Sequence, residues 1–171
     1  MATERAVKVI RRYLEDAIAA EKTFEDQLRG FAKEGSSEQV HRVFLQHADE
    51  THDQCERLTR RLDELGGSPS EAKSFLAHLF GVAPKIAQVG HDTVDRVTQN
   101  LMIAYAVENS EIAMYESLIA VAQAAGDDET ALLARDIQQQ EIEAADKVWR
   151  LISPWAQTSF NKLAGAEQVV S

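Results

Sequence analysis

The sequence of 171 residues contains few of the residues that interrupt helices or cross-link chains. It has three prolines and one cysteine, Cys55. One cysteine cannot form an internal disulfide, so a reducing compartment is the expected environment. No uncharged stretch approaches the roughly 18 apolar residues of a membrane span. No apolar signal-peptide core is visible in the first residues, MATERAVKVIRR. We therefore expect an all-α, cytoplasmic protein that does not enter a membrane.

Positive charge is also scarce. The chain has 18 lysines and arginines against 28 aspartates and glutamates, which gives a net charge of -10. This balance argues against nucleic acids and anionic membranes as primary partners, because both repel an acidic surface. It suits a solvated acidic surface or the capture of cations. The length indicates one domain with a sizeable core.

Residues 101–126 carry three acids and no base. On a helix, Glu108 and Glu111 fall in the middle of an apolar stripe made of Leu101, Ala104, Tyr115, Leu118, Ala122 and Ala125. Burying a carboxylate is costly unless a partner compensates its charge. This helix has no lysine or arginine after Arg96. The partner must therefore come from another helix, or be a metal ion or a proton.

The hydrophobic periodicity predicts four long helices. Thr3 can cap the first, which ends at Gly35. The others cover residues 38–65, about 92–125 and about 129–153, and Pro154 marks the end of the last one. We expect a bundle over residues 1–155. The tail, residues 156–171, has small and polar side chains, and we expect disorder there or packing on a partner.

The segment between the second and third helices, residues 70–92, is too long and too apolar for a simple turn. It suits a crossover with a short extra helix that joins two helical hairpins, which is the connectivity of ferritin-like bundles. Its apolar side chains exceed what one short helix needs for docking: Phe75, Leu76, Leu79, Phe80 and Val82. We therefore expect part of this surface to be buried in a homodimer.

Each of the four helices carries acids near its middle. In an antiparallel bundle these mid-height residues meet in one layer; they are Glu21, Glu50, Glu108, Glu111 and Glu141. Five carboxylates at one level would repel strongly without compensation. One or two metal cations would provide it, and an oxygen-rich site suits iron, manganese, magnesium or calcium better than zinc.

Three motifs resemble the YciF-like branch of the ferritin-like superfamily: YLEDAIAAEKTFEDQL (13–28), HADETHDQCERL (47–58) and VENSEIAMYESL (107–118). The resemblance covers most of residues 10–152. It implies a four-helix bundle with a short extra helix, a dimer, and a dinuclear metal site in bacteria under stress. We expect two iron ions, with manganese or another divalent metal as the alternative. The resemblance implies no defined reaction.

The sequence departs from the wider superfamily, in which two helices each supply a glutamate and a histidine at i+3. Neither Glu50 nor Glu141 is followed by a histidine at that position. His52 stands at i+2, on the other side of its helix, and cannot join the site. The fourth helix has Gln140-Glu141 and Ala145 where the branch often has additional acids. Water, His47, Gln54 and Gln140 are the candidates to complete the ligand set.

Each candidate residue also has a structural interpretation. Glu21, Glu108 and Glu111 could form a layer of protonated carboxyls. Glu50 and Glu141 lie beside their stripes, where a solvated side chain is equally expected. We interpret His47 as a donor to a carboxylate more than as a ligand, and Gln54 as a residue that orients one. Tyr115 either hydrogen-bonds the acids or packs against them.

The sequence is compatible with three classes of function. They are a metal-dependent oxidase or peroxide-consuming protein, a metal-binding protein without turnover, and a metal-free helical bundle that acts through its surface as a structural or interaction module.

Overall fold

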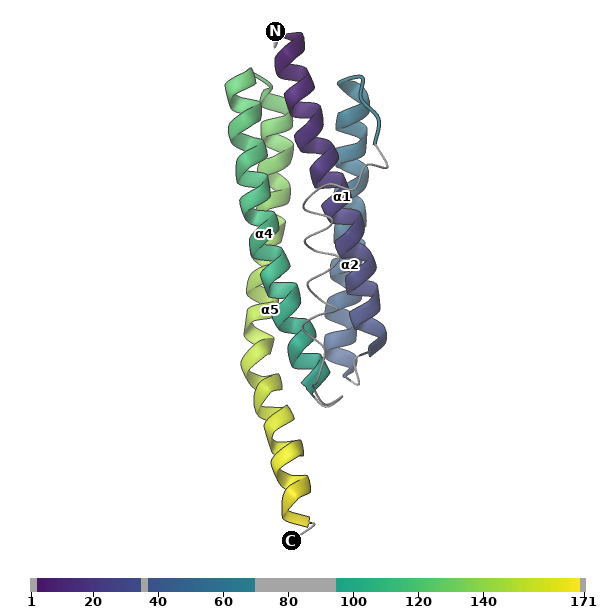
Figure 1. Cartoon of the computed structure of the whole chain (residues 1–171), viewed down its shortest axis with the longest axis vertical. Coiled ribbons are helices and arrows are strands. Elements are labelled where there is room, and N and C mark those ends of the chain that lie inside the picture. The colour runs from purple at the N-terminus through teal and green to yellow at the C-terminus, as the bar shows by residue number, and fades with distance from the viewer. Residues whose placement is uncertain (1–2, 35–36, 70–94, 170–171) are drawn as a thin grey trace.

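The computed structural model describes residues 3–34, 37–69 and 95–169. These residues form four helices and no strand: α1 (Glu4–Glu34), α2 (Glu38–Glu64), α4 (Arg96–Ala125) and α5 (Asp128–Val169). α1 and α2 form one antiparallel hairpin, α4 and α5 form a second, and α1 packs against α4 (Figure 1). The all-α ferritin-like arrangement predicted from the sequence is confirmed.

Local signals at the helix ends explain where the chain turns. The Ser37 side chain accepts a hydrogen bond from the Val40 N–H and caps α2. Gly126 ends α4 in the left-handed conformation, at φ 71°, which a residue without Cβ adopts at little cost. Asp127 follows at once, and its carboxylate accepts the Thr130 N–H at 3.0 Å and so caps α5. Gly126 and Asp127 thus form a tight turn between α4 and α5.

Most of the interior is apolar and follows the predicted stripes. Tyr115, Phe24, Phe44 and a set of leucines and isoleucines are almost completely buried. Burial of such side chains is the main favourable contribution to folding, at about 25 cal/mol for each Å² of apolar surface. In the middle of the bundle, acids and His47 replace apolar side chains.

The end of the last helix differs from the prediction. Pro154 lies inside α5, which continues to Val169, and the yellow end of this helix extends beyond the other three (Figure 1). Proline removes one backbone hydrogen bond and crowds the preceding turn. Good helix formers follow it, among them Ala156-Gln157 and Lys162-Leu163-Ala164, so the helix tolerates the loss. Of the two alternatives expected for residues 156–171, the helix to Val169 replaces disorder, and packing on a partner stays a prediction.

The predicted crossover and its apolar side chains, Phe75 to Val82, fall outside the described residues, so the homodimer stays a prediction. Within the described part of the chain, no helix combines the length and apolar character that a bilayer crossing requires.

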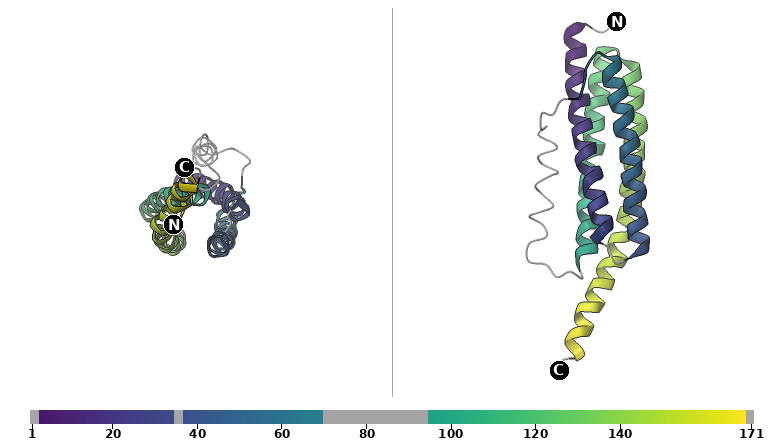
Figure 2. Two further views of the ribbon diagram at one scale, coloured as in Figure 1. Left: turned by 90° about the horizontal axis from the view of Figure 1, so that it is seen from below. Right: turned by 90° about the vertical axis from the view of Figure 1, so that its right-hand side faces the viewer.

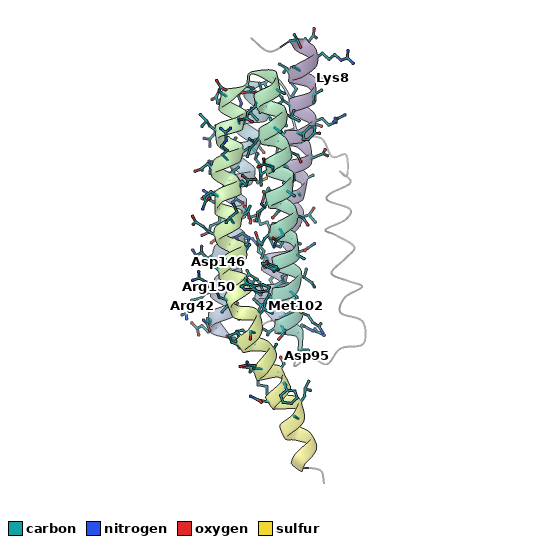
Figure 3. All side chains as sticks on the ribbon, turned by 90° about the vertical axis from the view of Figure 1, so that its left-hand side faces the viewer. Lys8, Arg42, Asp95, Met102, Asp146 and Arg150 are labelled. Carbon is teal, nitrogen blue, oxygen red and sulfur yellow. The ribbon has the colours of Figure 1, made fainter. Side chains whose placement is uncertain are left out.

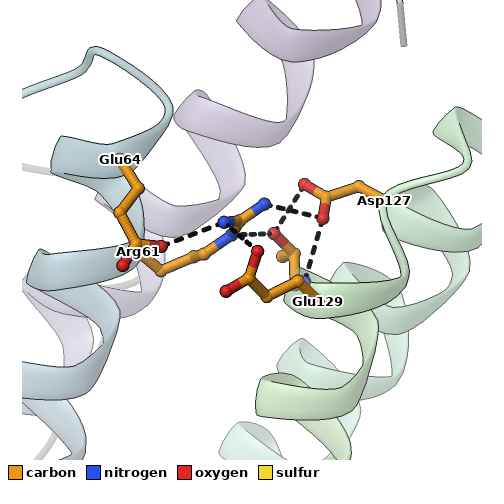
Figure 4. Close-up of polar contacts among 5 residues, drawn as sticks. Arg61, Glu64, Asp127 and Glu129 are labelled. Atoms are coloured by element: carbon orange, nitrogen blue, oxygen red, sulfur yellow. Dashed lines mark hydrogen bonds and ion pairs between the residues drawn. The ribbon is translucent and has the colours of Figure 1, made fainter. Parts of the chain in front are cut away.

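A charged cluster ties the end of α2 to the start of α5 (Figure 4). The guanidinium of Arg61 lies 2.8 Å from an Asp127 carboxylate oxygen and 2.6 Å from one of Glu129. It also donates to the Thr130 hydroxyl at 2.9 Å. Arg61 and Asp127 are largely buried, at 11% and 7% side-chain exposure. Partly desolvated, multiply bonded pairs of this kind contribute more to stability than exposed ones.

We predict that Arg61→Ala lowers the free energy of unfolding by about 2 kcal/mol, because it leaves the Asp127 carboxylate without its charged partner. The control is Arg57→Ala on the same helix, whose partner Asp136 is 60% exposed, with an expected loss below about 1 kcal/mol. Urea unfolding of both variants measures the difference. Equal losses would contradict a special role for Arg61.

Candidate metal centre

Four glutamates from three helices lie in the interior of the bundle. Glu21 of α1 and both Glu108 and Glu111 of α4 are 0% exposed, and Glu141 of α5 is 1% exposed. Their burial follows from the helical repeat, because each stands in register with apolar residues that face the core. The prediction that Glu21, Glu108 and Glu111 point inward is confirmed, and Glu141 joins them although its sequence position left this open.

His47 of α2 meets these acids. Its Nε2 atom lies 2.6 Å from Glu108 Oε1 and 3.9 Å from Glu141 Oε2. One donor atom from each of these three buried side chains lies within 4.8 Å of the donor atoms of the other two. The Phe24 ring packs edge-on against the imidazole, with 5.5 Å between centroids, and fixes one side of it. His47 is therefore placed as a possible ligand, a role that its sequence position favoured less than donation to a carboxylate.

The buried carboxylates are poorly satisfied by the protein itself. Tyr115 donates its hydroxyl to Glu21 Oε1. Among the described residues, the other seven carboxylate oxygens of Glu21, Glu108, Glu111 and Glu141 accept no hydrogen bond of normal geometry, and of these Glu108 Oε1 forms the close ion pair with His47. Native proteins leave few buried polar atoms without a partner. Their concentration in one layer leaves the charge there to be compensated by protons or by a bound cation.

The neighbouring polar residues divide between the site and its edge. Gln54 donates to the Gln140 side chain at 3.0 Å, and this bond links α2 to α5 beside the acids. Glu50 lies apart from the buried group, with 37% of its side chain exposed. Its carboxylate is 3.5 Å from His47 Nδ1 and accepts a hydrogen bond from Gln46. The structure does not bring Glu50 among the buried acids, so its ligand role stays a prediction.

His52 behaves as its spacing predicted. It lies on the outer surface, 53% exposed, with Nδ1 3.2 Å from Glu25. The nearby acids Asp53 of α2 and Glu116 of α4 are also exposed.

Burial dominates the electrostatics of the metal-free site. It raises the pKa of Glu21 to about 8, although the Tyr115 hydrogen bond and the nearby His47 oppose the shift. Burial and the surrounding carboxylates hold the pKa values of Glu111 and Glu141 well above their usual range. Burial alone would lower the pKa of His47, but the Glu108 carboxylate beside it outweighs this and raises it to about 9. Protons thus neutralise much of this layer near pH 7.

The donor set fits a divalent cation. Carboxylate oxygens with one imidazole nitrogen are ligands of iron and manganese, and a carboxylate that binds a cation no longer needs its proton. The carboxyls of Glu21, Glu111 and Glu141, whose pKa values are raised, can therefore exchange protons for a metal ion. Described residues of all four helices surround this position, and the two hairpins contribute to it equally: Glu21, His47 and Gln54 from one, Glu108, Glu111 and Glu141 from the other.

The fold and this layer of buried acids define a ferritin-like carboxylate bundle. The solved structure of a protein from Xanthomonas campestris is 28% identical to this chain, covers 94% of it and 99% of its own length, and has a TM-score of 0.78. The Escherichia coli stress protein YciF is 23% identical, covers 91% and 99%, and has a TM-score of 0.79. A ferritin-like, diiron-carboxylate protein from Bacillus anthracis is 18% identical, covers 88% and 99%, and has a TM-score of 0.71. At these identities the last two show a common fold.

A protein-family model matches most of the chain. Residues 8–160 match the model described as "Domain of unknown function (DUF892)". The chain belongs to this family, and its structural neighbours confirm the resemblance to YciF-like proteins.

The shifted pKa values predict an unusual pH dependence for the metal-free protein. A glutamate whose pKa rises from 4.5 to about 8 on folding stabilises the native state at low pH and loses this contribution as the pH rises through that window. The raised pKa of His47 acts with the same sign, up to about pH 9. With chelator present, the free energy of unfolding should fall by a few kcal/mol, on the order of one per pKa unit, between about pH 5 and pH 9.

Urea unfolding at a series of pH values measures this slope. Glu21→Gln should flatten it, because the amide does not titrate. Stability that rises with pH over the same window would contradict the proton-neutralised layer.

Proposed function

We propose that this protein binds divalent metal ions in the carboxylate layer of its bundle, and that the metal is iron. The observation that carries the proposal is the group of four buried glutamates, seven of whose eight carboxylate oxygens accept no hydrogen bond of normal geometry and one of which pairs with the buried imidazole of His47. Such a set is costly in a metal-free core and suited to a cation. Two ions, as expected from the resemblance, would share the layer.

The residues have distinct parts in this proposal. His47, Glu108 and Glu141 would hold one ion, because their donor atoms already converge. Glu21 and Glu111 would serve a second ion, with Glu50 as a further carboxylate at the edge of the layer. Tyr115 would orient Glu21 through its hydroxyl, and Gln54 would keep α2 aligned with α5. Bound iron would supply one-electron chemistry towards oxygen or peroxide.

Two structural neighbours support the proposed metal and the proposed cellular role. The Bacillus anthracis neighbour is described as a diiron-carboxylate protein, and the Escherichia coli neighbour as a stress protein. We extend both to this chain: a cytoplasmic iron protein that acts under stress. Consumption of oxygen or peroxide after addition of ferrous iron would separate an oxidase from a protein that only stores or buffers metal.

The alternative is a metal-free bundle that acts through its surface. One observation favours it: the pKa of Glu21 near 8 allows a neutral carboxyl in the core at physiological pH without any metal. In that case the acids form a protonated polar layer, and replacing them with neutral groups would leave the protein as stable as before or more so.

Removal of the α4 acids distinguishes the two functions. Glu108→Gln combined with Glu111→Gln preserves side-chain volume and removes both carboxylates of this helix. We predict that the double variant binds metal at least tenfold more weakly than the wild type, since each carboxylate at a metal site contributes to the affinity for the ion. The control is Glu116→Gln on the exposed face of the same helix. Elemental analysis of protein purified without a histidine tag measures metal content.

Thermal unfolding provides a second readout. A ligand that binds only the native state stabilises it, so chelator should lower the wild-type midpoint and leave the double variant unchanged. Absence of metal from the wild-type protein, together with no chelator effect, would establish the metal-free alternative.

A further inference from the structure

The four helices do not pack equally closely against one another. α1 packs extensively on α2 and α4 on α5, whereas α2 and α5 contact each other sparsely, as the end-on view in Figure 2 also shows. A cavity of about 30 Å³ lies at this seam. Gln46, His47 and Glu50 of α2 and Ala144 and Lys147 of α5 are among its lining residues. Its volume is enough for about two water molecules or a small cation.

Polar groups lead from solvent to the buried acids through this cavity. Lys147 Nζ lies 4.0 Å from Glu50 Oε1, and Glu50 Oε2 lies 3.5 Å from His47 Nδ1. The other nitrogen of the same imidazole contacts Glu108 at 2.6 Å. Side-chain exposure falls along this series, from 53% at Lys147 through 37% at Glu50 and 6% at His47 to 0% at Glu108. The imidazole thus separates the cavity from the site.

We propose that this cavity is the route by which the cation reaches the carboxylate layer, with Glu50 as the first carboxylate it meets and Lys147 as the charge that opposes it. This inference rests on the proposed metal-binding function. A half-exposed carboxylate can replace some of the waters of an arriving cation before it is fully desolvated, which lowers the cost of entering the core. The Lys147 ammonium competes with the cation for the same Glu50 oxygen.

The other approaches that the described residues define are less suitable. The seams between α1 and α2 and between α4 and α5 are densely packed, and the ion pairs of the Arg61 cluster close one end of the α2–α5 seam. No buried acid contacts solvent directly, because all four are at most 1% exposed. The partly exposed Glu50 can therefore contact a cation in solvent, whereas the four buried glutamates cannot.

The test measures the rate of metal uptake by the full chain. Metal-free protein is mixed with cobalt(II), and visible absorbance is followed by stopped flow at low salt. Lys147→Gln should accelerate uptake about fivefold, because one unit charge next to Glu50 is removed. The number of ions bound at equilibrium should not change, since Lys147 does not touch the buried acids. Gln46→Trp should slow uptake by covering the opening from an exposed position.

Arg150→Gln is the matched control. Arg150 lies one turn further along α5, is 75% exposed, pairs with Asp146 and points away from the bundle (Figure 3). The substitution changes the net charge by the same amount as Lys147→Gln but leaves the cavity intact. A faster rate in Lys147→Gln alone supports the route.

Two other outcomes contradict different proposals. Equal rates for wild type, Lys147→Gln and Gln46→Trp, or equal acceleration by Lys147→Gln and Arg150→Gln, overturn the route while leaving metal binding intact. No cobalt uptake and no iron or manganese binding by the wild type overturn the proposed function, and the route with it.

Discussion

The structure depends on how the charge of four carboxylates is compensated inside an apolar bundle. Glu21, Glu108, Glu111 and Glu141 occupy positions where leucine or alanine would pack at no electrostatic cost. A proton or a cation must neutralise much of this layer, and the single imidazole of His47 can match only one negative charge. The apolar residues above and below the layer provide the stability that offsets the cost of such a centre.

Much of this arrangement could be predicted from the sequence. The stripe that contains Glu108 and Glu111 determined their inward direction, because a helix with so few charges must bury most of its surface. The less predictable features depend on how helices rotate about their axes. Glu141 turns inward and Glu50 outward although both lie beside their stripes, since α5 and α2 adjust to neighbours that are distant in sequence. The short contact between His47 and Glu108 has the same origin.

Pro154 shows a different limit of prediction from local sequence. A proline usually marks the end of a helix, because it removes a hydrogen bond and crowds the turn before it. That local rule gives a cost for one position and does not consider the residues on either side. In this chain the helix formers after it outweigh the cost, so α5 passes beyond the bundle, and Phe160 in the extension remains 68% exposed.

The division of the donor atoms between the hairpins has a consequence for assembly. Glu21 and His47 belong to α1 and α2, whereas Glu108, Glu111 and Glu141 belong to α4 and α5. A shared ion would act as a non-covalent cross-link between two half-molecules, and its binding free energy would appear in their affinity for each other. By linkage, a chain divided between α2 and α4 would associate more tightly as metal is supplied. The metal-bound carboxylate layer would thus stabilise the association of the two hairpins.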